Sequence, residues 1–418
     1  MTLEGTGQET TSSNEMSRQK DTGIRRIYLD NAASTTIMDE VLNEMLPYLT
    51  THYGNPSSLH ALGYESNKAI KLARKRVSSI IGAKPSEIIF TGSGTEADNI
   101  AIKGAAYYLR KHNPYRNHVI TSAIEHDAVM ESCLDLENNG FEVSYLPVNR
   151  DGLVDKGKLV ESISEKTALV SIMLANNEIG TIQPIQELVR IVRERSEDIL
   201  FHTDAVQGLG KIHINCKKLG VDLMSLSSHK INGPKGVGGL YLREGSKVIS
   251  LTSGGGQEKD LRSGTENVHG IVGFGKACEM LIQRIDSINN GIRRLRDILV
   301  KGIVNEIPSA RYNGPSDSGI RLPNIAHFTF LGINGEDLLI KLDEYGIAAS
   351  TGSACSVRKQ KESHVLRAMG FALPEISGSL RLSLGPYNTE DEIDHVIGIL
   401  KVTVAELREV SPLRNTSH

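Results

Sequence analysis

The 418-residue sequence lacks features that define several protein classes. It has only four cysteines, far apart and without a Cys-x-x-Cys pair, which argues against zinc ribbons and disulfide scaffolds and indicates a reducing compartment. The net charge is only −3, so no basic or acidic surface dominates the chain. Neither nucleic acid nor an anionic membrane is therefore an expected partner, and no metal site is expected.

Long apolar runs are also missing. No stretch approaches the roughly 18 apolar residues that span a bilayer. Residues 1–22 are rich in Thr, Ser, Glu, Gln and Gly and contain no apolar core of a secretory signal. We interpret this segment as a disordered tail and expect a cytoplasmic protein without membrane contact.

The sequence does contain an α/β rhythm, in which short apolar runs alternate with helical patterns. Apolar residues at helical spacing occupy 97–109 and 185–195. The runs expected to form strands are 87–91, 118–122, 141–146, 167–174, 199–203, 222–227 and 238–242. The sequence therefore predicts an α/β fold with a seven-stranded, mostly parallel sheet covered by helices on both faces.

A long helix is expected to lead into a smaller α+β domain. Apolar residues in 275–307 step by three and four, which predicts one amphipathic helix. The elements expected beyond it are strands at 324–330, 347–350 and 380–384 and helices at 335–345, 363–369 and 389–409. We therefore expect a large domain over residues 38–284 and a small domain formed by residues 23–37 and 285–418.

One segment places a hydroxyl, an imidazole and an amine on a glycine-rich turn, in Ser228, His229 and Lys230. A lysine amine condenses with an aldehyde to form a Schiff base, and pyridoxal phosphate enzymes pair that amine with a carboxylate on the pyridinium nitrogen. Asp204, directly after the apolar run 199–203, is the candidate carboxylate. A lone loop lysine is usually just solvated, so this hypothesis depends on the motifs that accompany it.

The run 87–91 leads through a glycine turn into a helix, a geometry that binds phosphate. Gly94 allows the backbone to approach an anion, the helix N-terminus directs free N–H groups at it, and the Thr95 hydroxyl adds a donor. Such turns are also common without a ligand. The phosphate hypothesis therefore gains its weight from the combination with Lys230.

Two further strand ends carry polar groups. His126 follows the run 118–122 and could stack on an aromatic cofactor and move protons, or could simply cap a helix. Asn177 follows the run 167–174, and its amide could bond a ring hydroxyl or a substrate carboxylate, or belong to a plain turn. Neither residue decides the function alone.

Taken together, these motifs resemble the cysteine desulfurases of the aminotransferase class V family, which are pyridoxal phosphate enzymes of fold-type I. The resemblance covers residues 27–407. The segments that carry it are Leu29-Asp30-Asn31-Ala32-Ala33, Gly54-Asn55-Pro56-Ser57-Ser58-Leu59-His60, Glu125-His126, Asn176-Asn177-Glu178-Ile179-Gly180, Ser228-His229-Lys230, Arg262-Ser263-Gly264-Thr265 and Ser353-Ala354-Cys355-Ser356. It implies a fold-type I transferase with pyridoxal 5′-phosphate as cofactor.

The resemblance also implies roles for single residues. Lys230 would be the Schiff-base lysine, Asp204 the partner of the pyridine nitrogen, Gln207 a donor to the ring hydroxyl, and His126 the imidazole stacked on the ring. The residues that would hold the phosphate are Gly94, Thr95, Ser227, Ser228 and His229.

Three further roles follow from the same resemblance. Thr265 would reach the phosphate from the other subunit, which implies a homodimer with shared active sites. Asn177 would lie near the ring hydroxyl and the substrate carboxylate. Arg381 would bind that carboxylate with two hydrogen bonds, because its planar fork matches a carboxylate.

Cys355 sets the reaction type, since the cofactor alone allows transamination, decarboxylation or elimination. It lies among small residues in 351–356, a composition typical of a mobile loop that exposes a thiol, and it resembles the long-loop class of desulfurases. The other three cysteines fit buried apolar positions. We therefore expect L-cysteine to become L-alanine while its sulfur forms a persulfide on Cys355. Lys230 would remove the Cα proton, with His126 as acid and base.

The sulfur is expected to pass to an acceptor protein, such as an iron–sulfur scaffold, or to tRNA thiolation. The basic run 357–361 could attract an acidic acceptor or favour the thiolate, or be a solvated charge run. A selenocysteine lyase or another class V enzyme remains an alternative. A non-catalytic subunit that docks an assembly factor is a third, against which the intact Lys230, Asp204, His126 and Cys355 argue.

Overall fold

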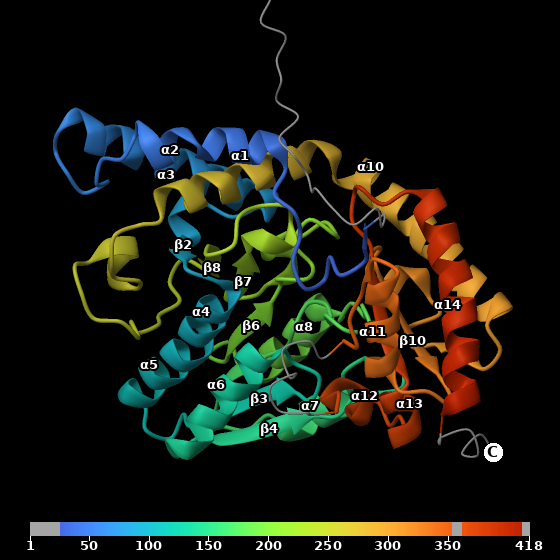
Figure 1. Cartoon of the computed structure of the whole chain (residues 1–418). Coiled ribbons are helices and arrows are strands. Elements are labelled where there is room, and N and C mark those ends of the chain that lie inside the picture. Colours follow the sequence, from blue (N-terminus) through green and yellow to red (C-terminus); the bar gives the residue numbers. More distant parts are fainter. Residues whose placement is uncertain (1–25, 353–361, 412–418) are drawn as a thin grey trace, which may run out of the picture.

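The structure, a computed structural model, describes residues 26–352 and 362–411 (Figure 1). Its centre is a seven-stranded sheet of order β2-β8-β7-β6-β5-β3-β4. The strands are β2 (Ile88–Thr91), β3 (His118–Ser122), β4 (Glu142–Leu146), β5 (Thr167–Ser171), β6 (Leu200–Asp204), β7 (Leu223–Ser227) and β8 (Gly238–Leu242). β8 is antiparallel to both neighbours, and the other pairs are parallel. The predicted seven-stranded, mostly parallel sheet is confirmed.

Helices bury both faces of this sheet. Successive side chains of a strand point to opposite faces, so each strand contributes to both clusters. On β2, Ile88 and Phe90 enter one hydrophobic cluster while Ile89 enters the other. The helices over the first face are α1 (Asp39–Met45), α3 (Ala61–Ile80), α7 (Lys156–Ser162), α8 (Ile185–Arg195) and α10 (Val268–Glu306). Those over the second are α4 (Gly94–Asn99), the π-helical turn η2 (Ile100–Gly104), α5 (Ala105–His112) and α6 (Asp127–Asn138).

The long helix α10 begins earlier than predicted, at Val268 rather than at residue 275. Glycine lowers helix propensity, so the sequence pattern understates this end of the helix. The glycines are needed for close packing. A β-carbon on Gly273 would lie 2.5 Å from Sδ of Met45, and one on Gly275 would lie 2.6 Å from Cα of Ala73. Helix α10 therefore packs closely against both α1 and α3 at these two positions.

A smaller α+β unit follows (Figure 1). Its antiparallel sheet has the order β12-β10-β9, and a short parallel pair joins β1 to β11. The strands are β1 (Ile27–Tyr28), β9 (Ala310–Tyr312), β10 (Ile325–Phe330), β11 (Ile347–Ala348) and β12 (Ser379–Ser383). The helices are α11 (Gly335–Glu344), α12 (His364–Ala368), α13 (Leu373–Ser377) and α14 (Glu390–Val410). Every strand and helix predicted here is present, whereas β1, β9 and α13 were not predicted.

The remaining helical elements are short. They are α2 (Pro47–Thr50), α9 (Cys216–Leu219), η1 (Pro85–Glu87), η3 (Ser228–Lys230), η4 (Gln257–Asp260) and η5 (Ser318–Ile320). Within the two described ranges, no helix is both long enough and apolar enough to cross a membrane.

The division of the chain at residues 37/38 and 284/285 stays a prediction, and the core forms separate hydrophobic clusters. Ile27 and Leu29 join the cluster that includes Ile292 and Val404, while Met38 joins the cluster of the large sheet. The N-terminal segment therefore packs with the C-terminal third of the chain. The predicted tail, residues 1–22, lies outside the described residues.

Candidate active site

Six strands of the central sheet run in the same direction, so their carboxyl ends meet at one edge. The glycine turn follows β2, His126 follows β3, Asn177 follows β5 and Asp204 ends β6. Lys230 lies in η3, directly after β7. The fold thus brings the sequence-predicted strand ends to one edge of the sheet.

The Lys230 amine is held by the segment that precedes α1. Its Nζ donates to the carbonyl oxygens of Ala32, at 2.6 Å, and Ala33, at 2.7 Å. The side-chain amide of Gln207 donates to the same Ala32 oxygen at 2.9 Å. The amine of Lys230 and the amide of Gln207 therefore lie beside each other at one carbonyl.

Asp204 is buried close to two basic groups. One carboxylate oxygen accepts the Val206 N–H at 2.8 Å. Burial raises the pKa of Asp204, and the nearby His126 and Lys230 oppose that rise. A cation beside this carboxyl group would favour its charged form. The surroundings of Asp204 therefore suit a protonated ring nitrogen.

His126 caps a helix, as one of its two sequence interpretations held, and its stacking on a cofactor stays a prediction. It is the N-cap of α6, where its Nδ1 accepts the Ala128 N–H at 3.1 Å. Because Nδ1 accepts, the neutral ring carries its proton on Nε2. Burial lowers the pKa of His126, and Asp204 partly opposes this effect. A neutral imidazole with a defined tautomer thus lies near Asp204 and Lys230.

The buried hydroxyl of Ser227, next to the glycine turn, fits a phosphate. A β-carbon on Gly94 would lie 2.8 Å from Cγ2 of Val206 and 3.4 Å from Cβ of Ser227, so the turn packs against the end of β7. The hydroxyls of Ser227 and Ser228 are buried and have no hydrogen-bond partner in the described part of the chain. Buried polar atoms normally have partners, so the Ser227 hydroxyl fits a bound anion. The Ser228 hydroxyl lies beside Gly233 instead. Thr95 is exposed in the first turn of α4.

His229 and Thr265 lie differently. The Nδ1 of His229 is 3.3 Å from the Ser34 hydroxyl, and burial, together with the positive charge of Lys230, lowers the pKa of His229 to about 4. Thr265 is exposed in the segment before α10. Its contact with the phosphate of a second subunit stays a prediction.

Arg381, on β12, is buried and already bonded in this structure. Its guanidinium donates to a carboxylate oxygen of Asp30 at 2.8 Å and to the carbonyl of Asn177 at 2.8 Å. Its Nε is buried without a partner among the described residues. The resemblance implies that Arg381 binds the substrate carboxylate, whereas here Asp30 supplies a carboxylate. Arg381 can therefore hold a carboxylate at this place.

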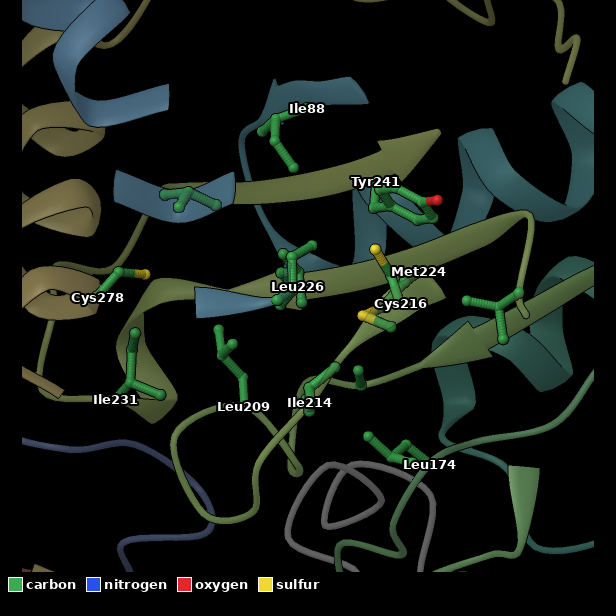
Figure 2. Packing of buried hydrophobic residues seen from close by; sticks show 14 of the residues in the cluster. Ile88, Leu174, Leu209, Ile214, Cys216, Met224, Leu226, Ile231, Tyr241 and Cys278 are labelled. Atoms are coloured by element: carbon green, nitrogen blue, oxygen red, sulfur yellow. The ribbon is translucent and has the colours of Figure 1, made fainter. Parts of the chain in front are cut away.

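The cysteines separate into two groups. Cys355 lies outside the described residues, as does the rest of residues 353–361. Cys133, Cys216 and Cys278 are buried, and Figure 2 shows Cys216 and Cys278 among the apolar side chains of the large core. Burial raises the pKa of all three, that of Cys133 to about 12, so their thiols stay protonated. Their predicted role as buried apolar residues is confirmed.

Sequence reasoning assigned no role to three buried ionisable residues near the site. Burial raises the pKa of Glu125 to about 8, and its Oε1 accepts from the Ser122 hydroxyl and the Met173 N–H. Burial and the charge of Asp204 raise the pKa of Asp98. His202 lies two residues before Asp204 on β6. The adjacency of Glu125 to His126 and of His202 to Asp204 was the available signal.

His202 predicts a pH dependence of stability. Burial lowers its pKa to about 3, and its ring bonds the hydroxyls of Ser171 at 2.8 Å and Ser225 at 2.9 Å. Below pH 6.5 the unfolded chain gains a proton that the folded chain does not, so His202 lowers the free energy of unfolding as pH falls. Between pH 7 and pH 5 this loss is about 2 kcal/mol.

Denaturant unfolding of the natural protein and of His202→Gln at both pH values isolates this effect, because all other titrating groups are common to both proteins. The pH-dependent loss should be smaller by that amount in the variant. Equal losses in the two proteins would show that His202 is protonated in the fold.

Comparison with known proteins shows the family of the chain. The family model described as aminotransferase class-V matches residues 27–396. A cysteine desulfurase IscS of Clostridium botulinum is 47% identical over 389 residues, which cover 93% of this chain and 97% of that protein. A cysteine desulfurase IscS of Methanosarcina thermophila is 49% identical, with coverage of 93% and 94%.

Solved structures give the same result. A NifS-like protein superposes with a TM-score of 0.86 at 41% identity, over 92% of this chain and 100% of that one. A structure described as SspA in complex with cysteine superposes with a TM-score of 0.76 at 36% identity, over 87% and 99%.

Proposed function

The chain belongs to the aminotransferase class-V family and is a cysteine desulfurase, and we propose the roles of Lys230, Asp204 and Cys355 in that reaction. One observation carries the proposal for the site. An amine, a buried carboxyl and the buried Ser227 hydroxyl, which has no hydrogen-bond partner among the described residues, gather at the carboxyl edge of the sheet. These are the groups that an aldehyde, a ring nitrogen and a phosphate require.

Pyridoxal 5′-phosphate is the cofactor we propose for this site. Lys230 would hold its aldehyde carbon, Asp204 its ring nitrogen and Gln207 its ring hydroxyl, with His126 stacked on the ring. The proposed phosphate ligands are Gly94, Thr95, Ser227, Ser228, His229 and Thr265 of a second copy. When bound, the cofactor supplies an electron sink for charge that develops on the substrate Cα.

The protein's own groups then act on L-cysteine. Arg381 and Asn177 hold the substrate carboxylate, with Asp30 giving up its place on the guanidinium. The Lys230 amine takes the Cα proton, because it is the basic group at the edge of the site. Neutral His126 carries a proton on Nε2 and serves as acid and base.

Cys355 takes the sulfur. Its thiolate forms a bond to the substrate sulfur as the bond between that sulfur and Cβ breaks. The electrons of the broken bond stay with the Cβ carbon, which gains one proton and becomes the methyl group of L-alanine. Cys355 becomes a persulfide whose outer sulfur is the sulfur of the substrate. The persulfide sulfur then passes to an acceptor protein, for which an iron–sulfur scaffold or a tRNA-thiolation carrier has suitable chemistry.

A homodimer accords with the surface of the molecule. Large apolar side chains are exposed on and between the helices α2 and α3, at one edge of the molecule (Figure 1). They are Leu49, Tyr53, Leu59 and Tyr64. Exposed apolar groups of this kind mark protein interfaces. The unpaired thiols of the described cysteines suit the reducing cytoplasm that we propose as its compartment.

Product analysis tests this function. We expect the cofactor-loaded protein to convert L-cysteine to L-alanine, with sulfide released when a reducing thiol is added. A keto acid as product would indicate a transaminase. Turnover of L-selenocysteine without any turnover of L-cysteine would indicate a selenocysteine lyase, and a protein that takes up no cofactor would support a non-catalytic subunit.

A further inference from the structure

The turn after β5 contacts both ends of the segment that carries Cys355. On the entering side, the Gly352 N–H donates to the Ser350 hydroxyl at 3.1 Å, and the Gly352 carbonyl accepts from Arg381 at 3.4 Å. On the leaving side, the Ser363 hydroxyl donates to Oε2 of Glu178 at 2.6 Å. Residues 353–361 lie between these two anchored ends in the sequence.

One carboxyl oxygen of Glu178 lies close to both ends of the Cys355 segment. A β-carbon on Gly352 would lie 3.1 Å from Oε2 of Glu178, the same atom that accepts from Ser363. Gly352 has a φ of +95°, which only glycine adopts readily. No side chain therefore separates the Gly352 backbone from the carboxyl group of Glu178.

The surroundings of Glu178 make this contact a fixed one. Its side chain is buried, and burial raises the pKa of Glu178. The Glu178 N–H donates to the Asn176 side chain at 2.8 Å, which fixes the turn itself. His327 lies on the other side of Gly352. A β-carbon on Gly352 would lie 3.4 Å from Nε2 of His327, and this nitrogen is buried without a partner in the described part of the chain.

The same turn contacts the proposed substrate carboxylate site. The carbonyl of Asn177, next to Glu178, accepts from Arg381 at 2.8 Å, and the Arg381 guanidinium also reaches the Gly352 carbonyl. Adjacent residues of one turn thus bind the arginine and the leaving end of the Cys355 segment, and Arg381 in turn binds the entering end. A shift of Glu178 would change the distance between the thiol and the bound substrate without touching Lys230 or Asp204.

We propose that Glu178 is a positioning residue for sulfur transfer, and this proposal rests on the proposed function. Its carboxyl group binds Ser363 on the leaving side of the Cys355 segment and lies against Gly352 on the entering side. Glu178 touches neither cofactor nor sulfur. It determines how often the Cys355 thiol comes within reach of the substrate sulfur.

Two substitutions of Glu178 test this inference. Glu178→Ala removes the acceptor of the Ser363 hydroxyl and leaves space at Gly352. Persulfide formation at saturating L-cysteine should slow by about 10- to 100-fold, the effect of a small misplacement of reacting groups. Glu178→Gln keeps an oxygen acceptor of the same shape and should retain the rate to within about threefold of the natural protein.

The measurements separate positioning from general damage. The absorbance change that L-cysteine produces in the cofactor-loaded protein should stay the same in Glu178→Ala, because it depends on Lys230. The rate of Cys355 persulfide formation, followed by mass spectrometry, should fall, with a lower kcat and little change in KM. Equal losses of both signals would overturn the proposal, as would an unchanged persulfide rate.

Glu87→Ala is the matched control. Glu87 is also buried and binds the backbone N–H groups of Lys84 and Glu244, at the opposite edge of the sheet. Its replacement should leave the persulfide rate unchanged. Absence of alanine formation by the natural protein would instead contradict the proposed function, so the two failures are distinguishable.

A second pair of variants keeps the test valid if Glu178→Ala does not fold. Ser363→Ala removes the hydroxyl that Glu178 accepts, and Ser363→Thr retains a hydroxyl. Ser363 also caps α12 by accepting the Leu366 N–H at 3.1 Å, a role that threonine can fill. We expect a slower persulfide rate in Ser363→Ala and a restored rate in Ser363→Thr. Equal rates in both would contradict the proposal.

Discussion

Lys230→Ala is expected to yield a folded protein without covalently attached cofactor and with alanine formation reduced at least about 10³-fold. The amine serves twice in the proposed reaction, as the covalent attachment point and as the base at Cα. In this structure the Lys230 amine binds the carbonyls of Ala32 and Ala33. Absorbance of the adduct and borohydride reduction, followed by peptide mass analysis, measure the attachment.

Lys235→Ala serves as the control, because Lys235 is exposed and lies in the same glycine-rich turn. It should keep both the adduct and the rate. A Lys230→Ala protein that retained a reducible adduct, or the rate of Lys235→Ala, would remove Lys230 from both roles.

Cys355→Ser is expected to separate cofactor chemistry from sulfur transfer. The variant should bind cofactor and change its absorbance with L-cysteine as before, because Lys230 and Asp204 are intact. Alanine formation and persulfide should fall at least about 10³-fold, the scale seen when a nucleophile is removed. A serine hydroxyl is not ionised at neutral pH and cannot carry a persulfide. Chromatography of alanine and mass spectrometry of the alkylated peptide measure both products.

Cys216→Ala is the matched control. Burial raises the pKa of Cys216 and it packs in the large core, so it should contribute no sulfur chemistry (Figure 2). Persulfide formation in this variant should equal that of the natural protein. Full sulfur release by Cys355→Ser would assign the thiol step to another group.

Local sequence patterns predicted most of the fold because each core strand is a short apolar run with a clear end. The elements that the sequence did not predict correctly have local causes. β1 has 2 residues and β9 has 3, too few to show a pattern. The first turns of α10 contain Gly273 and Gly275, which propensity disfavours and which close packing against α1 and α3 requires.

The site was predictable only as far as strand ends determine it. Lys230, Asp204, His126 and the glycine turn each follow or end a strand, and parallel strands bring their carboxyl ends together. The carbonyls of Ala32 and Ala33 lie far from Lys230 in sequence, and nothing local indicated that they bind its amine.

Glu178 and His202 were missed for a related reason. The property that distinguishes them is burial beside other polar groups, which only the folded chain creates. Asp30 was quoted within a motif, but its bond to Arg381 depends on strand β12, some 350 residues later. Contacts of this range leave no periodic signal in the sequence.

The ratio of L-alanine to Cys355 persulfide in a single turnover tests the central claim most directly. The cofactor-loaded protein receives less than one equivalent of L-cysteine, without acceptor or reducing thiol, and both products are quantified at short times. The account predicts one persulfide on the Cys355 peptide for each alanine formed. Alanine that accumulates while this peptide stays unmodified would contradict it.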